Sequence, residues 1–330
     1  MGSSIVSEWR QAVRGCPQGS NLGPLMWNIY QNDLVSRILK CRLSMFADDH
    51  LMYCSGQKMG EIADVINDEG KRISQWYRDN QLKGNQDKFQ AMGLGNKTKD
   101  TEMNLDIMNN NIESKSAIRI LGVTIDKELN FTQHISDICS KAARKVGVLY
   151  RFKNMITTKA KLALYKSFIL PNLTYCHMVW QFCRASDARK IERIQERALR
   201  AVYSSKNLEY SDLLKEAGLP TLRERRLKDL AIFMYKVKNE LAPSYIKDLF
   251  KLNNKNYSLR NADDFNIHRF NTVKTGKHSI RYMGPFLWSK LDKAIKEVPS
   301  LNLFKSKIDQ VNIEELLNDN CRRGCLLCNS

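Results

Sequence analysis

Residues 44–54 read SMFADDHLMYC, and this stretch decides the fold of the N-terminal part of the chain. Two short apolar runs flank the adjacent aspartates Asp48 and Asp49, a pattern typical of a tight β-hairpin with a two-residue polar tip. Aspartate tolerates the left-handed backbone that such a tip requires. Two carboxylates held there could bind a pair of Mg²⁺ ions for in-line phosphoryl transfer, because Mg²⁺ prefers hard oxygen ligands. The alternative is a solvent-exposed turn in which aspartate is merely common.

Loops and helices surround the predicted hairpin. Residues 14–25, RGCPQGSNLGPL, contain three glycines and two prolines, which indicates a structured loop that could approach a nucleotide closely or simply turn the chain. The following residues 25–38 are expected to form a buried helix. Residues 80–88, NQLKGNQDK, form a polar turn whose Lys83 and Lys88 could neutralise or protonate a pyrophosphate, or could be solvated loop lysines.

The remaining pattern is strand-like at first and then helical. SAIRILGVTID, residues 116–126, predicts two short strands around Gly122. From Asn130 onward helices dominate, and one carries an apolar stripe that leaves three basic residues off it. The stripe comprises Ile135, Ile138, Ala142, Val146 and Leu149, and the basic residues are Lys141, Arg144 and Lys145. A second helix is expected to stop before Pro171.

The net charge of +18 lies almost wholly in one part of the chain. Residues 1–127 hold 16 Lys and Arg against 15 Asp and Glu, whereas residues 128–330 hold 37 against 20. Such an excess of positive charge favours a nucleic-acid partner over a merely solvated surface. No apolar run is long enough to span a bilayer, so no membrane partner is expected. The nine cysteines are scattered and odd in number, which favours a reducing compartment and an intracellular protein of the cytoplasm or nucleus.

The C-terminal segment CRRGCLLC places Cys321, Cys325 and Cys328 close together. Structural zinc needs four ligands, and no histidine follows closely. A partial Zn²⁺ site contacting RNA and a tail with free cysteines both remain open, and the ligand count favours the free cysteines.

Four segments, in this order, carry a family resemblance. PQGSNLGPL, FADD, WYRDNQLKGNQDK and ILGVTIDKELNFTQHI resemble the consecutive B, C, D and E blocks of reverse transcriptases, and are most similar to those of non-LTR (LINE-type) retrotransposons. LALYKSFILPNLTYCHMVW, ERALRAVY and the segment from Ser258 to Trp288 resemble the C-terminal region of such elements.

The resemblance implies roles at the matching positions. Asp48 would bridge two catalytic Mg²⁺ ions, for which Mn²⁺ could substitute, and Asp49 would contribute more weakly. The other implied roles are the nucleotide and template pocket (Gln18 and Gly19), the pyrophosphate (Lys88), the hairpin at the primer end (Leu121 and Gly122) and the phosphate backbone (Lys141, Arg144 and Lys145). The implied partners are an RNA template, a DNA primer and deoxynucleoside triphosphates.

The expected fold class is mixed α and β, namely a partial polymerase palm with a catalytic β-hairpin followed by a basic, mostly helical thumb and C-terminal region. We expect a partial palm in residues 1–127, a thumb-like helical region in 128–185 and a helical C-terminal domain in 186–330. The resemblance also implies a third metal-binding carboxylate upstream of the glycine-rich loop, where Glu8 is the only acidic residue. We therefore expect the C-terminal portion of an RNA-directed DNA polymerase, inactive alone. A remnant that binds RNA or an RNA–DNA duplex without catalysis is the main alternative, and a group II intron-type maturase is a weaker one.

Overall fold

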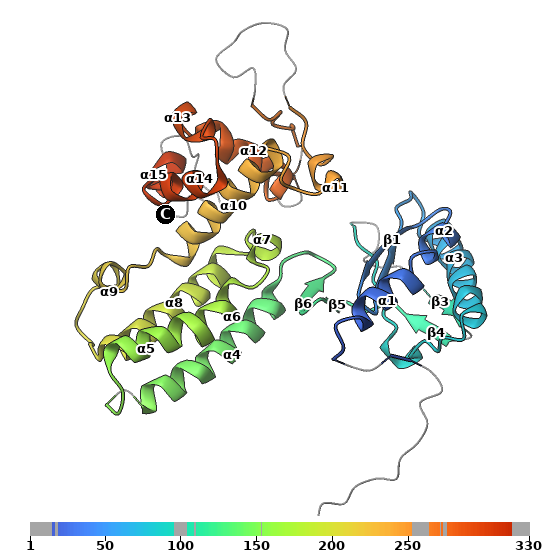
Figure 1. Ribbon diagram of the computed structural model, residues 1–330, viewed down its shortest axis with the longest axis horizontal. Helices are drawn as coiled ribbons and strands as arrows, with labels where there is room; N and C mark the ends of the chain where they lie inside the picture. Colours follow the sequence, from blue (N-terminus) through green and yellow to red (C-terminus); the bar gives the residue numbers. More distant parts are fainter. Residues whose placement is uncertain are drawn as a thin grey trace, which may run out of the picture. The chain divides into compact units, whose positions relative to one another are not determined.

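The computed structural model describes residues 15–16, 19–95, 104–108, 110–152, 154–252, 264–270, 272 and 276–318 of the chain. Contacts between Cα atoms divide the chain into two compact units, residues 1–118 and 119–330 (Figure 1). The division falls inside one short strand, β5 (Ala117–Ile120). Gln18 and the three C-terminal cysteines of the predicted zinc segment lie outside the described residues.

The first unit combines helices with two antiparallel hairpins. Its elements are α1 (Gly23–Tyr30), α2 (Leu34–Arg37), β1 (Arg42–Phe46), β2 (Asp49–Tyr53), α3 (Met59–Asp79), the 3₁₀ turn η1 (Gln86–Lys88), β3 (Asn104–Ile107) and β4 (Asn110–Glu113). Strand β1 pairs with β2, and β3 pairs with β4. The predicted hairpin around the aspartate pair is therefore present.

A small apolar core joins α3 to the β3–β4 hairpin. Leu105 and Ile112 are buried there, with Ile66 of α3 packed against them. Gly70 allows this close approach, because a Cβ at that position would lie 3.0 Å from Cγ1 of Ile107. The β1–β2 hairpin, in contrast, contains no fully buried residue.

The second unit begins with a hairpin and continues as helices. Its elements after β5 are β6 (Val123–Asp126), α4 (Thr132–Arg151), α5 (Thr158–Leu164), the π-helical turn η3 (Tyr165–Ile169), α6 (Leu170–Thr174), α7 (His177–Trp180), α8 (Ala185–Tyr203), α9 (Tyr210–Ala217), α10 (Leu222–Lys238), α11 (Ser244–Lys247), α12 (Ile280–Lys290), α13 (Lys293–Lys296), α14 (Leu301–Asp309) and α15 (Ile313–Asn318). Among the described residues, no helix is both long and apolar enough to cross a membrane.

Two apolar cores organise these helices. In the first, α4 lies along α8 and buries Ile135, Ala142 and Val146, which confirms the predicted stripe (Figure 1). In the second, α10 packs against α12, α14 and α15 around Trp288 and Phe304. The mixed α and β class, with mainly helices after the hairpins, agrees with the sequence analysis.

Two expectations from the sequence are wrong in detail. Helix α1 is not buried, since Leu25, Met26 and Ile29 are 55%, 57% and 69% exposed. After Thr158 the helical backbone continues without a break through η3 into α6, and so past Pro171. In η3 the N–H of Leu170 bonds to the carbonyl oxygen of Tyr165, five residues back, so the hydrogen-bond pattern has already changed where the proline, which has no N–H, follows.

Candidate catalytic hairpin and nucleic-acid interface

The tip of the β1–β2 hairpin consists of Ala47 and Asp48. Phe46 pairs with Asp49, so Asp49 is the first residue of β2 and the predicted Asp48–Asp49 tip is displaced by one residue. Ala47 has the left-handed backbone, with φ of 52°, that the sequence analysis assigned to an aspartate. The two carboxylates still follow each other directly at this end of the hairpin.

A hydrogen bond from α1 holds the tip in place. Nε1 of Trp27 donates to the carbonyl oxygen of Ala47 at 2.9 Å. Trp27 belongs to α1, whose first turn contains Pro24. The indole therefore connects the helix after the glycine-rich loop to the turn that presents Asp48.

His50 anchors the start of β2 on two helical segments. Its Nε2 lies 3.0 Å from Oε1 of Gln31, and its Nδ1 lies 2.7 Å from the hydroxyl of Tyr77 on α3. Because an amide oxygen only accepts, Nε2 donates and Nδ1 of the neutral ring accepts from Tyr77. Burial lowers the pKa of His50, although Asp48 and Asp49 act in the opposite direction. The neutral imidazole is therefore a structural link directly after the aspartate pair.

The aspartate pair supplies some of the ligands that a divalent metal ion needs. Both side chains are exposed, and neither forms a hydrogen bond or ion pair with another residue that the structure describes. Two free neighbouring carboxylates supply the hard oxygen ligands that Mg²⁺ takes. Within the described ranges, however, no group of three or more His, Cys, Asp and Glu side chains could hold a metal ion. The hairpin thus offers two carboxylate ligands.

The polar turn after α3 borders a hollow of about 670 Å³. Lys83 and Asn85 line this hollow together with Tyr77, the partner of His50. Lys88 is exposed at the end of η1 and is not among the lining residues. Of the two lysines considered in the sequence, the structure brings Lys83 to the hollow. Gly19 is exposed, with φ of 82°.

The predicted primer-end residues form the turn of the β5–β6 hairpin. Leu121 and Gly122 both have left-handed backbones, with φ of 45° and 83°. The hydroxyl of Tyr175 donates to the carbonyl oxygen of Leu121 at 2.8 Å, which joins the turn to the end of α6.

The three predicted basic residues of α4 are exposed, but they do not all line the same pocket. Lys141 and Lys145 line a second pocket, of about 410 Å³, together with Arg119 of β5, whereas Arg144 does not. Nζ of Lys145 donates to the carbonyl oxygen of Phe168 at 3.0 Å and to Oδ1 of Asn172 at 3.1 Å. Sequence spacing placed the basic residues on one helix, and the structure shows which of them share a pocket.

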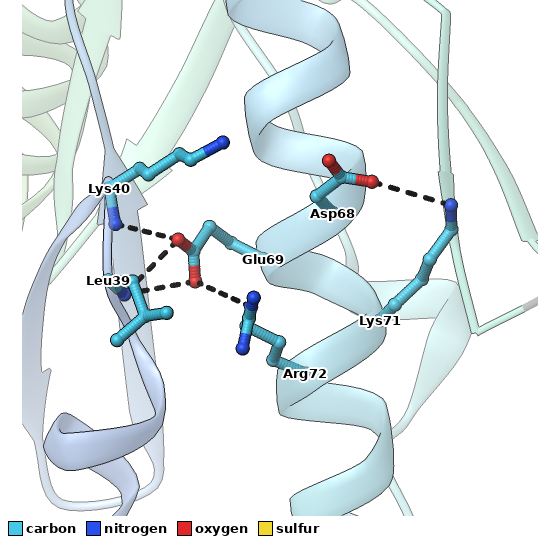
Figure 2. Close-up of polar contacts among 6 residues, drawn as sticks. All are labelled: Leu39, Lys40, Asp68, Glu69, Lys71 and Arg72. Carbon is cyan, nitrogen blue, oxygen red and sulfur yellow. Dashed lines mark hydrogen bonds and ion pairs between the residues drawn. The ribbon is translucent and has the colours of Figure 1, made fainter.

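Sequence reasoning missed a buried carboxylate beside the hairpin, that of Glu69. Its side chain is 1% exposed and accepts hydrogen bonds from the backbone N–H groups of Leu39 and Lys40, the shortest at 2.7 Å (Figure 2). Arg72 lies 4.0 Å away on the same helix. Glu69 thus fixes the chain just before β1. Its position on the apolar stripe of α3, between Ile66 and Ile73, was the available signal.

Comparison with known proteins shows which family part of the chain resembles. Residues 3–125 match the reverse transcriptase (RNA-dependent DNA polymerase) family, and this part of the chain contains the aspartate hairpin and the polar turn. This region of the chain is therefore similar to a family of nucleotidyltransferases. No solved structure matches the chain.

The relatives are polymerases of mobile elements. Over 206 residues the chain is 29% identical to the probable RNA-directed DNA polymerase from transposon X-element of Drosophila melanogaster, covering 60% of this chain and 23% of that protein. It is 22% identical over 230 residues to the RNA-directed DNA polymerase from mobile element jockey of the same species, covering 66% and 25%. The retrovirus-related Pol polyprotein from type-1 retrotransposable element R1 2 of Nasonia vitripennis is 28% identical over 177 residues, covering 50% of this chain and 43% of that protein.

These matches confirm the resemblance to reverse transcriptases of non-LTR retrotransposons. The matched region spans less than half of each relative's length.

Proposed function

We propose that the chain is a portion of an RNA-directed DNA polymerase that adds deoxynucleotides to a primer 3′-OH. The observation that carries this proposal is the pair of carboxylates of Asp48 and Asp49, which have no partner among the described residues and lie at the end of a β-hairpin inside the reverse transcriptase region. These two side chains would hold Mg²⁺, or Mn²⁺ in its place. When bound, such ions stabilise the attacking and leaving oxygens of phosphoryl transfer.

The hydrogen bonds around the hairpin support a positioning role for its neighbours. Trp27 holds the carbonyl of Ala47, and His50 is held between Gln31 and Tyr77. A carboxylate pair must be fixed to bind metal in one geometry, and a neutral, fully hydrogen-bonded His50 gives this rigidity without competing for the ligands. These contacts are all within the first unit.

The remaining roles are proposals by resemblance. Gln18 and Gly19 line the nucleotide and template pocket, Lys88 lies near the pyrophosphate, and Leu121 with Gly122 contacts the primer end. Lys141, Arg144 and Lys145 contact the phosphate backbone of the template–primer duplex. The substrates are an RNA template, a DNA primer and deoxynucleoside triphosphates, and the site of action is inside the cell, in the cytoplasm or nucleus. Zn²⁺ at Cys321, Cys325 and Cys328 is not part of the proposal.

We propose that the chain alone does not extend a primer. The described residues supply two carboxylates at the hairpin and no third metal-binding side chain beside them. The second candidate function is therefore binding of RNA or an RNA–DNA duplex without catalysis. The excess of basic residues in 128–330, 37 against 20 acidic, favours such binding.

Iron-directed cleavage tests the metal site without requiring activity. Fe²⁺ with ascorbate and peroxide generates hydroxyl radicals that cut the backbone close to the bound ion. We expect cleavage within residues 46–50, suppressed by excess Mg²⁺ and lost when Asp48→Asn and Asp49→Asn are combined. Asp64→Asn, an exposed carboxylate of α3, is the matched control and should leave the cut in place. Cleavage that persists in the double variant would reject the metal site.

Primer extension and duplex binding separate the two functions. We expect no extension of a DNA primer on RNA by the chain alone, with salt-sensitive binding of the duplex. Extension that is equal in the wild type and Asp48→Ala would remove the catalytic assignment. Affinity that does not change between low and physiological salt would contradict the duplex-binding function.

A further inference from the structure

The pocket of about 410 Å³ in the second unit has a concentrated positive charge. Its cationic side chains come from two elements, Arg119 from β5 and Lys141 and Lys145 from α4. No aspartate or glutamate lines it. None of the three cations forms an ion pair within the part of the chain that the structure describes. The pocket is therefore suited to an anion.

Hydrogen bonds hold one of the three cations of the pocket, Lys145, in place. Lys145 donates to the carbonyl oxygen of Phe168 and to Oδ1 of Asn172, which leaves one of its three N–H donors for a ligand. Phe168 lies in the π-helical turn η3, and such turns occur frequently at functional sites. The hydrogen bond from Tyr175 to Leu121 fixes the hairpin at the border of the pocket.

His134 also lines the pocket, as a neutral group. It is 4% exposed, and its Nδ1 accepts a hydrogen bond from the backbone N–H of Thr124 at 3.3 Å. Burial is the main cause that lowers its pKa; Lys141 and Arg119 lower it further, while Asp137 acts in the opposite direction. The positive charge thus comes from the arginine and the two lysines.

The border of the pocket has exposed aromatic rings. Phe168 is 60% exposed and Tyr175 is 54% exposed, and both line the pocket. Proteins that bind single nucleic-acid strands combine cations for the backbone with aromatic side chains on which bases stack. A free inorganic anion would make no use of these rings.

We infer that this pocket binds one backbone phosphate of a nucleic-acid strand, with Arg119, Lys141 and Lys145 on the phosphate and Phe168 beside the adjoining nucleoside. This inference rests on the proposed binding of a template–primer duplex and assigns one phosphate of its single-stranded overhang to a defined site. Arg144, on the same helix, lies outside the site.

Lysine acetylation with and without bound nucleic acid tests the site residue by residue. We expect an RNA–DNA duplex with a single-stranded overhang to protect Lys141 and Lys145 from acetylation, as measured by mass spectrometry. Lys159, exposed on α5 and outside the pocket, is the control and should react equally in both samples. Equal reactivity of Lys141 and Lys145 with and without duplex would overturn the inference.

Binding measurements on variants give a second readout. Combined Lys141→Gln and Lys145→Gln should weaken duplex binding about tenfold and reduce the slope of log Kobs against log salt by about 0.9, the contribution of one phosphate contact. Lys159→Gln should change neither. If the double variant and Lys159→Gln behave alike while the wild type binds with strong salt dependence, the pocket inference fails and the proposed duplex binding stands. If the wild type does not bind duplex at all, both fail.

The phosphate group in the pocket could come from a nucleic-acid backbone or from free inorganic phosphate. Measuring both ligands on the wild type and on Phe168→Leu separates these two sources. We expect Phe168→Leu to weaken binding of the overhang duplex and to leave the affinity for inorganic phosphate unchanged. The nucleic-acid assignment would be overturned if the wild type and Phe168→Leu bound inorganic phosphate equally and also bound the overhang duplex equally. Circular dichroism of each variant checks that the helices are retained.

Discussion

The hydroxyl of Tyr175 donates a hydrogen bond to the carbonyl of Leu121, which has a left-handed backbone with φ of 45°. The indole of Trp27 donates in the same way to the carbonyl of Ala47, with φ of 52°. Each unit therefore contains the same arrangement. An aromatic side chain from a helical segment donates a hydrogen bond to the backbone carbonyl of a hairpin-turn residue whose backbone is left-handed. The two turns are those to which the resemblance assigns the catalytic aspartate and the primer end.

Removing either aromatic donor should loosen only its own turn. Trp27→Phe and Tyr175→Phe each delete one hydrogen bond worth about 1 kcal/mol and retain a ring. We expect about fivefold faster amide exchange in residues 44–53 for Trp27→Phe, and in residues 117–126 for Tyr175→Phe. Each variant is the control for the other, and hydrogen exchange with mass spectrometry measures both. Faster exchange in both turns from one substitution would contradict this local role.

Glycine should relieve the left-handed turn at Leu121. A non-glycine residue with this backbone costs about 1–2 kcal/mol, so we expect Leu121→Gly to raise the free energy of unfolding of the second unit by up to about 1 kcal/mol. Leu164 has a similar exposure, 39% against 42%, but lies in α5. Leu164→Gly should lower stability by about 1 kcal/mol. Urea denaturation measures both, and the same sign for the two variants would contradict the assigned backbone strain.

Glu69 should contribute more to stability than the exposed acid beside it. Glu69→Ala leaves the N–H groups of Leu39 and Lys40 without their acceptor (Figure 2). Because these bonds are only part-buried, we expect a total loss near the lower end of the range of about 1–3 kcal/mol for an unsatisfied buried group. Asp68→Ala removes only an exposed contact with Lys71 at 3.5 Å, worth at most about 1 kcal/mol. Thermal denaturation of both variants checks this order. Equal losses would show that the buried carboxylate has no special role.

The sequence pattern predicted local features well and features set by tertiary contacts poorly. The β1–β2 hairpin and the α4 stripe follow from alternation and helical spacing. The identity of the left-handed residue does not, because propensity favours Asp48 whereas the bond from Trp27 selects Ala47. The exposure of Ile29 also depends on which segments cover α1.

The candidate site also combines features that local sequence predicts with features that only tertiary contacts determine. Spacing along α4 placed Lys141, Arg144 and Lys145 together, but only the fold brings Arg119 to two of them. Helical periodicity could not predict the π-helical turn η3, whose Phe168 carbonyl accepts from Lys145.

Cys41 should resist alkylation at mildly basic pH. Burial, then the neighbouring Cys54, raises the pKa of the Cys41 thiol to about 12. Since the thiolate is the nucleophile, only about one thiol in ten thousand is reactive at pH 8. We expect iodoacetamide to modify the exposed Cys16 well before Cys41, as measured by peptide mass spectrometry, and urea to remove the difference. Labelling of Cys41 as fast as Cys16 in the folded chain would contradict the raised pKa.

Glu192 should make the second unit less stable as the pH rises. Its carboxyl accepts hydrogen bonds from Tyr210 and from the N–H of Leu222, but burial dominates and raises its pKa above the ordinary 4.5. The folded chain then retains this proton to a higher pH than the unfolded chain does. The contribution is fully present below pH 4.5 and is lost as the pH rises from there through the folded-state pKa.

The variant Glu192→Gln isolates this effect, because the amide can still accept both hydrogen bonds but does not titrate. We expect the free energy of unfolding of the wild type, minus that of Glu192→Gln, to fall between pH 4 and pH 7 in urea titrations. Glu216→Gln, the same charge change at an exposed position of α9, is the matched control. A difference that rises with pH would mean that the hydrogen bonds from Tyr210 and Leu222 outweigh burial, so that the ionised carboxylate is the favoured form in the folded chain.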